Sequence, residues 1–169
     1  MCIDEDSTLV LKQTSELDQH SERLNPDGSV DCFFRVRYAE TDAMGVVHHA
    51  SYIVWFEEGR SSFMRAHSYP YSQVERDGFY FTVTEVHARL VASARYDEQV
   101  AVRTRVGELR SRGIRFDYEV RRATDGALLV TGYTRHVCID HQGRVRTIPD
   151  ELRQLMRTPS KKSIRPLPG

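Results

Sequence analysis

A short segment in the first third of the chain carries the side chains best suited to chemistry. Residues 38–52, YAETDAMGVVHHASY, combine a carboxylate, a glycine turn and two adjacent histidines, and an amphipathic segment follows. The first turn of a helix exposes backbone N–H groups and the positive end of the helix dipole, which bind an oxygen that becomes negative during a reaction. We expect His49 at that helix end, and Asp42 can fold back toward it across the turn at Gly45. A carboxylate facing such an oxyanion hole can attack an activated carbonyl or deprotonate water, so the spacing predicts acyl transfer, for which a thioester is a suitable substrate.

The same residues also admit structural roles. Asp42 can simply cap the turn that follows it, and the spacing alone does not favour catalysis over capping. The pair His48-His49 suggests a metal, but neighbouring side chains are expected to point apart and no third ligand stands at a suitable spacing, so we predict no zinc site. Tyr38 can be an inward-facing aromatic residue of a strand.

The elements that position this segment follow from the spacing of apolar residues. The sequence DCFFRVRYAE predicts a strand before it, with alternate residues through Tyr38 on one side, and SYIVWFEEGRSSFMRAH predicts one helix after it. Later segments alternate apolar and polar residues at period two, which is typical of antiparallel strands with one buried face. Turns are predicted at Asp125-Gly126 and at HQG, and PDELRQLM predicts a short helix. The fold class is therefore α+β, with one helix covering one antiparallel sheet. The expected apolar face of the helix comprises Tyr52, Phe56, Gly59 and Phe63.

Length and charge limit the possible partners. A chain of 169 residues with equal numbers of acidic and basic residues predicts one globular domain without the long-range field that attracts nucleic acid or an anionic membrane. We expect no membrane span, because no apolar run is long enough, and no signal peptide, because the N-terminus is acidic. Three cysteines at wide spacing predict no disulfide framework. These features favour the cytoplasm.

Two polar regions flank the expected domain. We predict that residues 1–30 form a polar N-terminal extension, that 31–157 form the domain, and that 158–169 form a flexible tail. Residues 12–30 show no steady apolar period and contain the turn signal NPDG, so we place them outside the core. The last segment, TPSKKSIRPLPG, is rich in proline and basic residues.

Two longer sequence runs resemble a known family. YAETDAMGVVHHASYIVWFEEGR and FTVTEVHARLVASARYDEQVAV are similar to the hotdog-fold thioesterases of the 4-hydroxybenzoyl-CoA thioesterase type, especially to the acyl-CoA thioesterase subfamily encoded beside the Tol-Pal system in many bacteria. The resemblance covers about residues 32–157. It implies a long central helix wrapped by a curved antiparallel sheet, a homodimer joined edge to edge with active sites at the interface, and often a homotetramer. The implied reaction is hydrolysis of an acyl-CoA, or of an acyl carrier protein thioester, without a cofactor or metal.

The resemblance also implies roles for particular residues. Asp42 matches the catalytic nucleophile or general base, His49 the residue whose backbone N–H polarises the thioester carbonyl, and Tyr38 a tyrosine near the carboxylate. His48 replaces the tyrosine or phenylalanine usual in the subfamily, which affects the expected acyl preference. The implied turn residues are Gly45, Val46 and Val47, and the implied contacts to the CoA phosphates are Arg110 and Arg112.

Alternative assignments stay open at this level. In a different hotdog branch the catalytic glutamate lies on the central helix, so Glu57 and Glu58 compete with Asp42, although charged helix residues are usually solvated or paired, here with Arg60 or Arg65. The same fold also carries dehydratases and hydratases of acyl thioesters, and fold alone does not decide the reaction. A non-catalytic acyl-CoA-binding protein is the remaining alternative.

Overall fold

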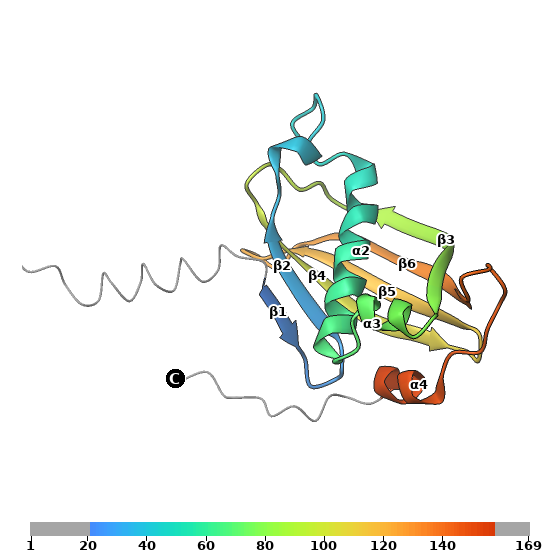
Figure 1. The fold of residues 1–169 in the computed structure, drawn as a ribbon. Coiled ribbons are helices and arrows are strands. Elements are labelled where there is room, and N and C mark those ends of the chain that lie inside the picture. Colours follow the sequence, from blue (N-terminus) through green and yellow to red (C-terminus); the bar gives the residue numbers. More distant parts are fainter. Residues whose placement is uncertain (1–20, 158–169) are drawn as a thin grey trace, which may run out of the picture.

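One antiparallel sheet of six strands forms the body of the molecule (Figure 1). The computed structural model describes residues 21–157. Each pair of neighbouring strands runs antiparallel, in the order β1-β2-β4-β5-β6-β3. The strands are β1 Ser21–Leu24, β2 Val30–Arg35, β3 Tyr80–Leu90, β4 Gln99–Leu109, β5 Gly113–Arg122 and β6 Leu128–Ile139.

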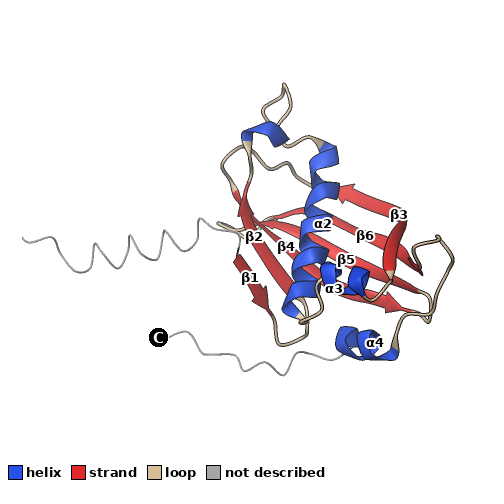
Figure 2. Ribbon diagram, viewed as in Figure 1, coloured by secondary structure: helices blue, strands red, loops and turns tan. Residues whose placement is uncertain are grey.

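A single long helix, α2 (His49–Ala66), lies across one face of this sheet (Figure 2). The buried residues of α2 include all four of the expected apolar face, so that prediction is confirmed. They pack against the inward-facing side chains of the strands, among them Phe116 and Tyr118 of β5, and the ring of Phe56 stacks on that of Tyr118. The observed architecture confirms the predicted α+β class. None of the helices in residues 21–157 is both long and apolar enough to cross a membrane.

Gly59 lets α2 approach the sheet closely. A Cβ atom at this position would lie 2.5 Å from Thr104 Oγ1 and 2.8 Å from Val102 Cγ1, both on β4. Neither contact is possible for a real carbon atom without a shift of the helix or the strand. The absence of a side chain at Gly59 therefore sets the distance between α2 and β4.

Three shorter helical segments complete the described fold. The 3-10 helix η1 (Tyr38–Glu40) follows β2, α3 (Tyr71–Arg76) follows α2, and α4 (Asp150–Arg157) follows β6. The predicted short helix near residue 150 is confirmed by α4, whereas the sequence did not predict α3. The strand expected to reach Tyr38 ends at Arg35. Tyr38 lies in η1 and is 76% exposed, so the interpretation of Tyr38 as an inward-facing strand residue is wrong.

The N-terminal part of the described chain belongs to the sheet. β1 pairs with β2 in register from Ser21 opposite Phe33 to Leu24 opposite Val30, and Val30 is fully buried. Residues 21–30 therefore do not lie outside the core as predicted, because backbone pairing with β2 incorporates a polar strand that has no apolar period of its own. The predictions for residues 1–20 and 158–169 concern positions outside the described residues.

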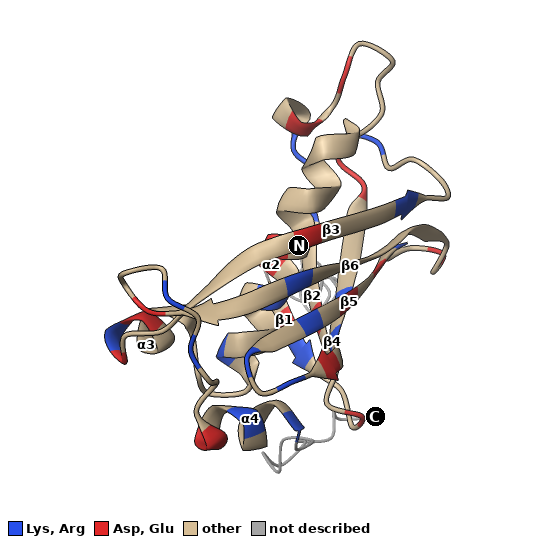
Figure 3. Cartoon of the chain, turned by 90° about the vertical axis from the view of Figure 1, so that its right-hand side faces the viewer, with Lys and Arg blue, Asp and Glu red and all other residues tan. Residues whose placement is uncertain are grey.

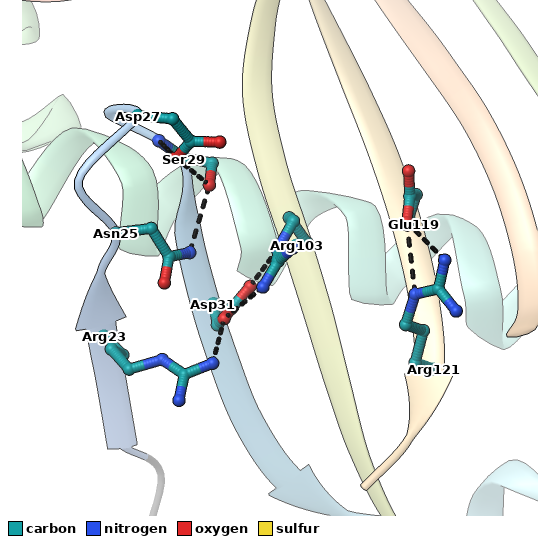
Figure 4. A network of polar contacts seen from close by, with 8 residues as sticks. All are labelled: Arg23, Asn25, Asp27, Ser29, Asp31, Arg103, Glu119 and Arg121. Atoms are coloured by element: carbon teal, nitrogen blue, oxygen red, sulfur yellow. Dashed lines mark hydrogen bonds and ion pairs between the residues drawn. The ribbon is translucent and has the colours of Figure 1, made fainter. Parts of the chain in front are cut away.

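A buried carboxylate joins β1, β2 and β4 (Figure 4). Asp31 of β2 is 2% exposed and accepts two hydrogen bonds from Arg103 of β4, at 2.7 and 2.9 Å, and one from Arg23 of β1 at 2.6 Å. Burial raises the pKa of the Asp31 carboxyl, but the hydrogen bonds from the two arginines outweigh this effect and hold the pKa below its usual value. Asp31 thus stabilises the edge of the sheet that the sequence placed partly outside the domain.

Candidate active site

The loop between η1 and α2 folds into a compact turn. Thr41 and Val47 form an antiparallel bridge, the Asp42 N–H donates to the Val46 carbonyl at 2.9 Å, and the Gly45 N–H donates to the Asp42 carbonyl at 2.9 Å. Gly45 has a φ of +70°, a left-handed conformation that favours glycine. The segment Gly45, Val46 and Val47 therefore reverses the chain and delivers it into α2.

Asp42 lies in this turn with one carboxylate oxygen engaged. Its Oδ1 atom accepts the Met44 N–H at 2.8 Å, so the capping role that the sequence left open is present in the structure. Among the described residues, the Oδ2 atom has no hydrogen-bond partner, and the residue is only partly buried. The backbone N–H holds the carboxylate in place while one oxygen stays available for chemistry.

The start of α2 leaves one backbone donor open. His48 caps the helix, because its Nδ1 accepts the Ala50 N–H at 3.2 Å and its carbonyl accepts the Ser51 N–H at 2.9 Å. No residue in the described part of the chain accepts the His49 N–H. The two histidine rings lie in contact, with centroids 4.1 Å apart, so the expectation that they point apart is wrong. An unpaired N–H at a helix N-terminus can stabilise a developing oxyanion.

Tyr38 sits at the surface of the same segment. Its ring meets the ring of Tyr96 edge to face at 5.6 Å, and its carbonyl accepts the N–H and the hydroxyl of Thr41. Tyr38, Asp42 and His49 thus all lie on the continuous segment from η1 to the first residue of α2. The connection between β2 and α2, which contains this segment, lies at one end of the molecule (Figure 1).

Glu40 is a buried carboxylate that the sequence reasoning missed. It is 8% exposed, and its carboxylate accepts Trp55 Nε1 at 2.9 Å, the Arg37 N–H at 2.8 Å and the Arg37 guanidinium at 2.8 Å. Burial raises the pKa of the Glu40 carboxyl, but the hydrogen bonds from Arg37 and Trp55 outweigh it and keep the pKa below its usual value. The local pattern YAETD contains no signal for this burial, which depends on a tryptophan 15 positions further along the chain.

A cavity of about 280 Å³ opens beside Glu40. It lies between the end of β2, η1 and the second and third turns of α2. The lining mixes charged and apolar side chains. Glu40 therefore borders this cavity as well as the core. The lining residues are Phe34, Arg35, Arg37, Glu40, Val54, Trp55 and Glu58.

Comparison with known proteins decides the class of this site. The sequence profile of the thioesterase-like superfamily matches residues 36–156, which include the whole loop and all of α2. This chain belongs to the thioesterase-like superfamily.

Curated and solved relatives of the superfamily are similar over most of the domain. The acyl-CoA thioesterase YbgC of Haemophilus influenzae is 30% identical over 107 residues, which are 63% of this chain and 77% of the relative. A hypothetical protein of Thermus thermophilus is 43% identical, with a TM-score of 0.71 over 75% of this chain and 95% of its own. The DHNA-CoA thioesterase of Staphylococcus aureus is 27% identical, with a TM-score of 0.72 over 75% and 87%. These similarities confirm the expected hotdog fold and the expected class, a thioester hydrolase of the 4-hydroxybenzoyl-CoA thioesterase type.

The rival carboxylates of this thioesterase-like chain lie on α2 and have basic partners. Glu57 is 67% exposed at its side chain and lies 3.7 Å from Arg60, and Glu58 lies 3.0 Å from Arg65. Both glutamates therefore have basic partners, as the sequence predicted, although Glu58 is only partly exposed. Asp42 is a better candidate than these two glutamates, because it shares a segment with the open N–H at the start of α2.

The predicted phosphate contacts lie far from that loop within one chain of this thioesterase-like protein. Gln99 at the start of β4 pairs with Arg35 near the loop, whereas Arg110 and Arg112 follow its other end. A strand rises roughly 3.3 Å per residue, so the eleven residues of β4 separate the two ends by about 33 Å. Arg110 pairs with Glu108 at 2.7 Å. The structure does not bring either arginine to Asp42 in a single subunit.

Arg112 instead borders a second cavity, of about 580 Å³, next to the start of α4. Arg146 lines the same cavity, and the guanidinium of Arg112 has no acidic partner among the described residues. Basic and acidic residues are interspersed along the strands of the sheet (Figure 3). Of the two predicted arginines, Arg112 is thus better placed to receive an anionic group.

Proposed function

We propose that this member of the thioesterase-like superfamily hydrolyses the thioester bond of an acyl-CoA, with Asp42 as nucleophile or general base and the His49 N–H as oxyanion donor. One observation carries the proposal. The cap at His48 leaves the His49 N–H without an acceptor among the described residues. The loop that ends at this N–H also holds the Asp42 carboxylate, whose Oδ2 atom has no hydrogen-bond partner among the described residues. The names of the curated relatives support an acyl-CoA as the substrate.

The proposed reaction follows from these two groups. The carbonyl oxygen of the thioester accepts the His49 N–H, which stabilises the negative charge that forms on this oxygen. Asp42 either attacks the carbonyl carbon, or takes a proton from a water molecule that attacks it. The C–S bond breaks, the CoA sulfur leaves as a thiolate and takes up a proton, and water supplies the oxygen of the free acid.

The unpaired edge of β3 supports a homodimer. Among the described residues, β3 pairs only with β6, and its eleven residues include the exposed side chains of Val83, Val86 and Leu90. A long exposed edge of this kind is a template for another strand. We infer that β3 pairs antiparallel with β3 of a second copy and extends the sheet across both subunits.

Antiparallel pairing would also complete the substrate site. The Leu90 end of β3 leads to Ala94, whose carbonyl accepts the Val47 N–H of the loop between η1 and α2, here called the catalytic loop (residues 41–48). The Tyr80 end of β3 lies opposite Ile139, next to the end of the sheet that holds Arg112. A two-fold axis through β3 brings the partner's Arg112 toward Asp42. The CoA phosphates would then contact the partner's Arg112 rather than that of the subunit that performs the reaction.

Thiol release from a panel of aliphatic and aromatic acyl-CoAs tests the proposal. Asp42→Asn is nearly isosteric and keeps an acceptor for the Met44 N–H, and we expect it to lower kcat by about 10²- to 10⁴-fold, because the carboxylate is lost. Asp125→Asn is a matched control. Asp125 accepts the Ala127 N–H at 2.9 Å in the same turn geometry, but in the hairpin between β5 and β6.

The control separates turn stability from catalysis. We expect Asp125→Asn to keep the turnover of the wild-type protein. Equal activity of the two variants would exclude Asp42 as the catalytic carboxylate. If the wild-type protein releases no thiol from any acyl-CoA, CoA thioester hydrolysis itself is overturned. The same acyl groups attached to acyl carrier protein would then be the next substrates to test.

A further inference from the structure

Glu40 contacts both ends of the catalytic loop. Its backbone carbonyl accepts the His48 N–H at 2.8 Å and the Ser51 hydroxyl at 3.3 Å, so it is bonded to the cap and to the first turn of α2. Asp42 follows Glu40 by two residues in the chain. A displacement of Glu40 would therefore change the position of Asp42 relative to the His49 N–H.

The side chain of Glu40 attaches this junction to the hydrophobic core. Its carboxylate accepts the indole N–H of Trp55 in the second turn of α2. Trp55 is 2% exposed and packs edge to face on Phe34 of β2, with centroids 5.4 Å apart, and on Tyr52, at 4.8 Å. The Glu40 carboxylate is thus hydrogen-bonded to the Trp55 indole, which core packing holds in one orientation.

The other bonds of the loop do not supply this attachment. The Asp42–Val46, Asp42–Gly45 and Asp42–Met44 hydrogen bonds lie inside the turn and move with it. The Val47 N–H bonds to Ala94, and the bridge between Thr41 and Val47 links the two ends of the loop to each other. Glu40 is the residue of this segment that hydrogen-bonds both to the start of α2 and to Trp55 in the core, and no reacting group in the proposed mechanism needs its carboxylate.

We propose that Glu40 is a positioning residue, which holds the carboxylate of Asp42 in register with the open N–H of His49 through its bonds to Trp55, His48 and Ser51. The inference rests on the proposed function, because it assigns a role within the same site. A reacting pair displaced by about 1 Å loses on the order of a hundredfold in rate. Glu40 therefore affects turnover without contact to the substrate.

The test compares two buried carboxylates. Of the described residues, Asp31 and Glu40 are the buried acidic ones, and Asp31 bonds to Arg23 and Arg103 at the opposite side of the sheet from α2. We expect Glu40→Ala to lower kcat about 10- to 100-fold with KM changed less than about threefold. Asp31→Asn should lose stability and keep kcat. Both variants are assayed after circular dichroism and light scattering confirm that they are folded and have the same mass in solution as the wild-type protein.

A second variant isolates the bond to Trp55. Trp55→Phe keeps an aromatic ring in the core but removes the N–H donor, and we expect it to lower kcat in the same direction as Glu40→Ala. The double variant should be no slower than Glu40→Ala, because both substitutions remove one interaction. Trp55 is the only tryptophan of the chain, so its fluorescence reports the loss of Glu40 directly, and Asp31→Asn should leave its emission unchanged.

The outcomes separate the two proposals. If Asp42→Asn is inactive while Glu40→Ala turns over like Asp31→Asn, the role of Glu40 is overturned and the proposed function stands. If the wild-type protein hydrolyses no thioester, the proposed function is overturned. Hydrogen exchange of residues 41–51 then decides whether Glu40 holds this segment in position. Faster exchange in Glu40→Ala than in Asp31→Asn supports it, and equal exchange in both variants excludes it.

Discussion

Adjacent histidines divide two tasks at the start of α2. His48 uses its ring nitrogen and its carbonyl to satisfy the N–H groups of Ala50 and Ser51, whereas the N–H of His49 stays open. A helix end normally presents several unpaired donors, and water competes for each of them. Because the neighbouring donors are capped, the His49 N–H stays open, and the proposed mechanism assigns it to the substrate oxygen.

The cap makes a prediction at the scale of one residue. His48→Ala removes the acceptor of the Ala50 N–H, and we expect a loss of about 1 kcal/mol, which lowers the Tm by roughly 2–4 °C for a chain of this length. His48→Asn supplies another good capping side chain and should retain most of the stability. Thermal unfolding followed by circular dichroism measures both. Equal Tm values for the Ala and Asn variants would show that the ring does not cap the helix.

At the scale of elements, the position of α2 on the sheet depends on Gly59. An alanine in a helix interior is ordinarily more stable than a glycine by roughly 1 kcal/mol. Here the added Cβ would meet Thr104 and Val102 at less than the distance of real contacts, so we expect Gly59→Ala to lower the free energy of unfolding by about 1–3 kcal/mol. Urea unfolding measures the change. A stabilised Gly59→Ala variant would mean that α2 does not rest on β4 at this point.

At the scale of the whole molecule, the proposed pairing of β3 with β3 of a second copy would complete the substrate site. Val86 lies near the middle of β3 and is 42% exposed, and a two-fold axis there would bring two copies of this position together. We expect Val86→Lys to give monomers, because two ammonium groups would be buried against each other, and to raise the KM for acyl-CoA, because the partner's Arg112 is lost. Light scattering measures the mass, and thiol release measures KM.

A matched surface variant controls for the added charge. Leu155 on α4 is 37% exposed, and Leu155→Lys should leave both the mass and the KM unchanged. A Val86→Lys protein that remains a dimer would place the interface elsewhere. A wild-type monomer with full activity would show that one chain contains the complete site.

The sequence by itself determined the features that depend on neighbouring residues. The period of apolar residues predicted α2 and the paired strands, because burial of one face imposes a local repeat. The glycine turn, the helix start and the carboxylate are also close together in the chain, so the pattern from Tyr38 to His49 predicted that Asp42 precedes the turn into α2 and that His49 stands at the start of the helix, and it indicated the family that the chain resembles. The family and the hotdog fold are confirmed.

Only the tertiary structure decided the features that depend on distant segments. Polar β1 joins the sheet because β2 offers it hydrogen bonds, Glu40 is buried because Trp55 lies above it, and Arg112 lies at the far end of β4 from Asp42. None of these features has a local signature. In the sequence alone, the residues of a polar edge strand, a buried carboxylate and an arginine without an acidic partner cannot be distinguished from solvated residues. Pairing and packing between remote segments supply the information that local patterns lack.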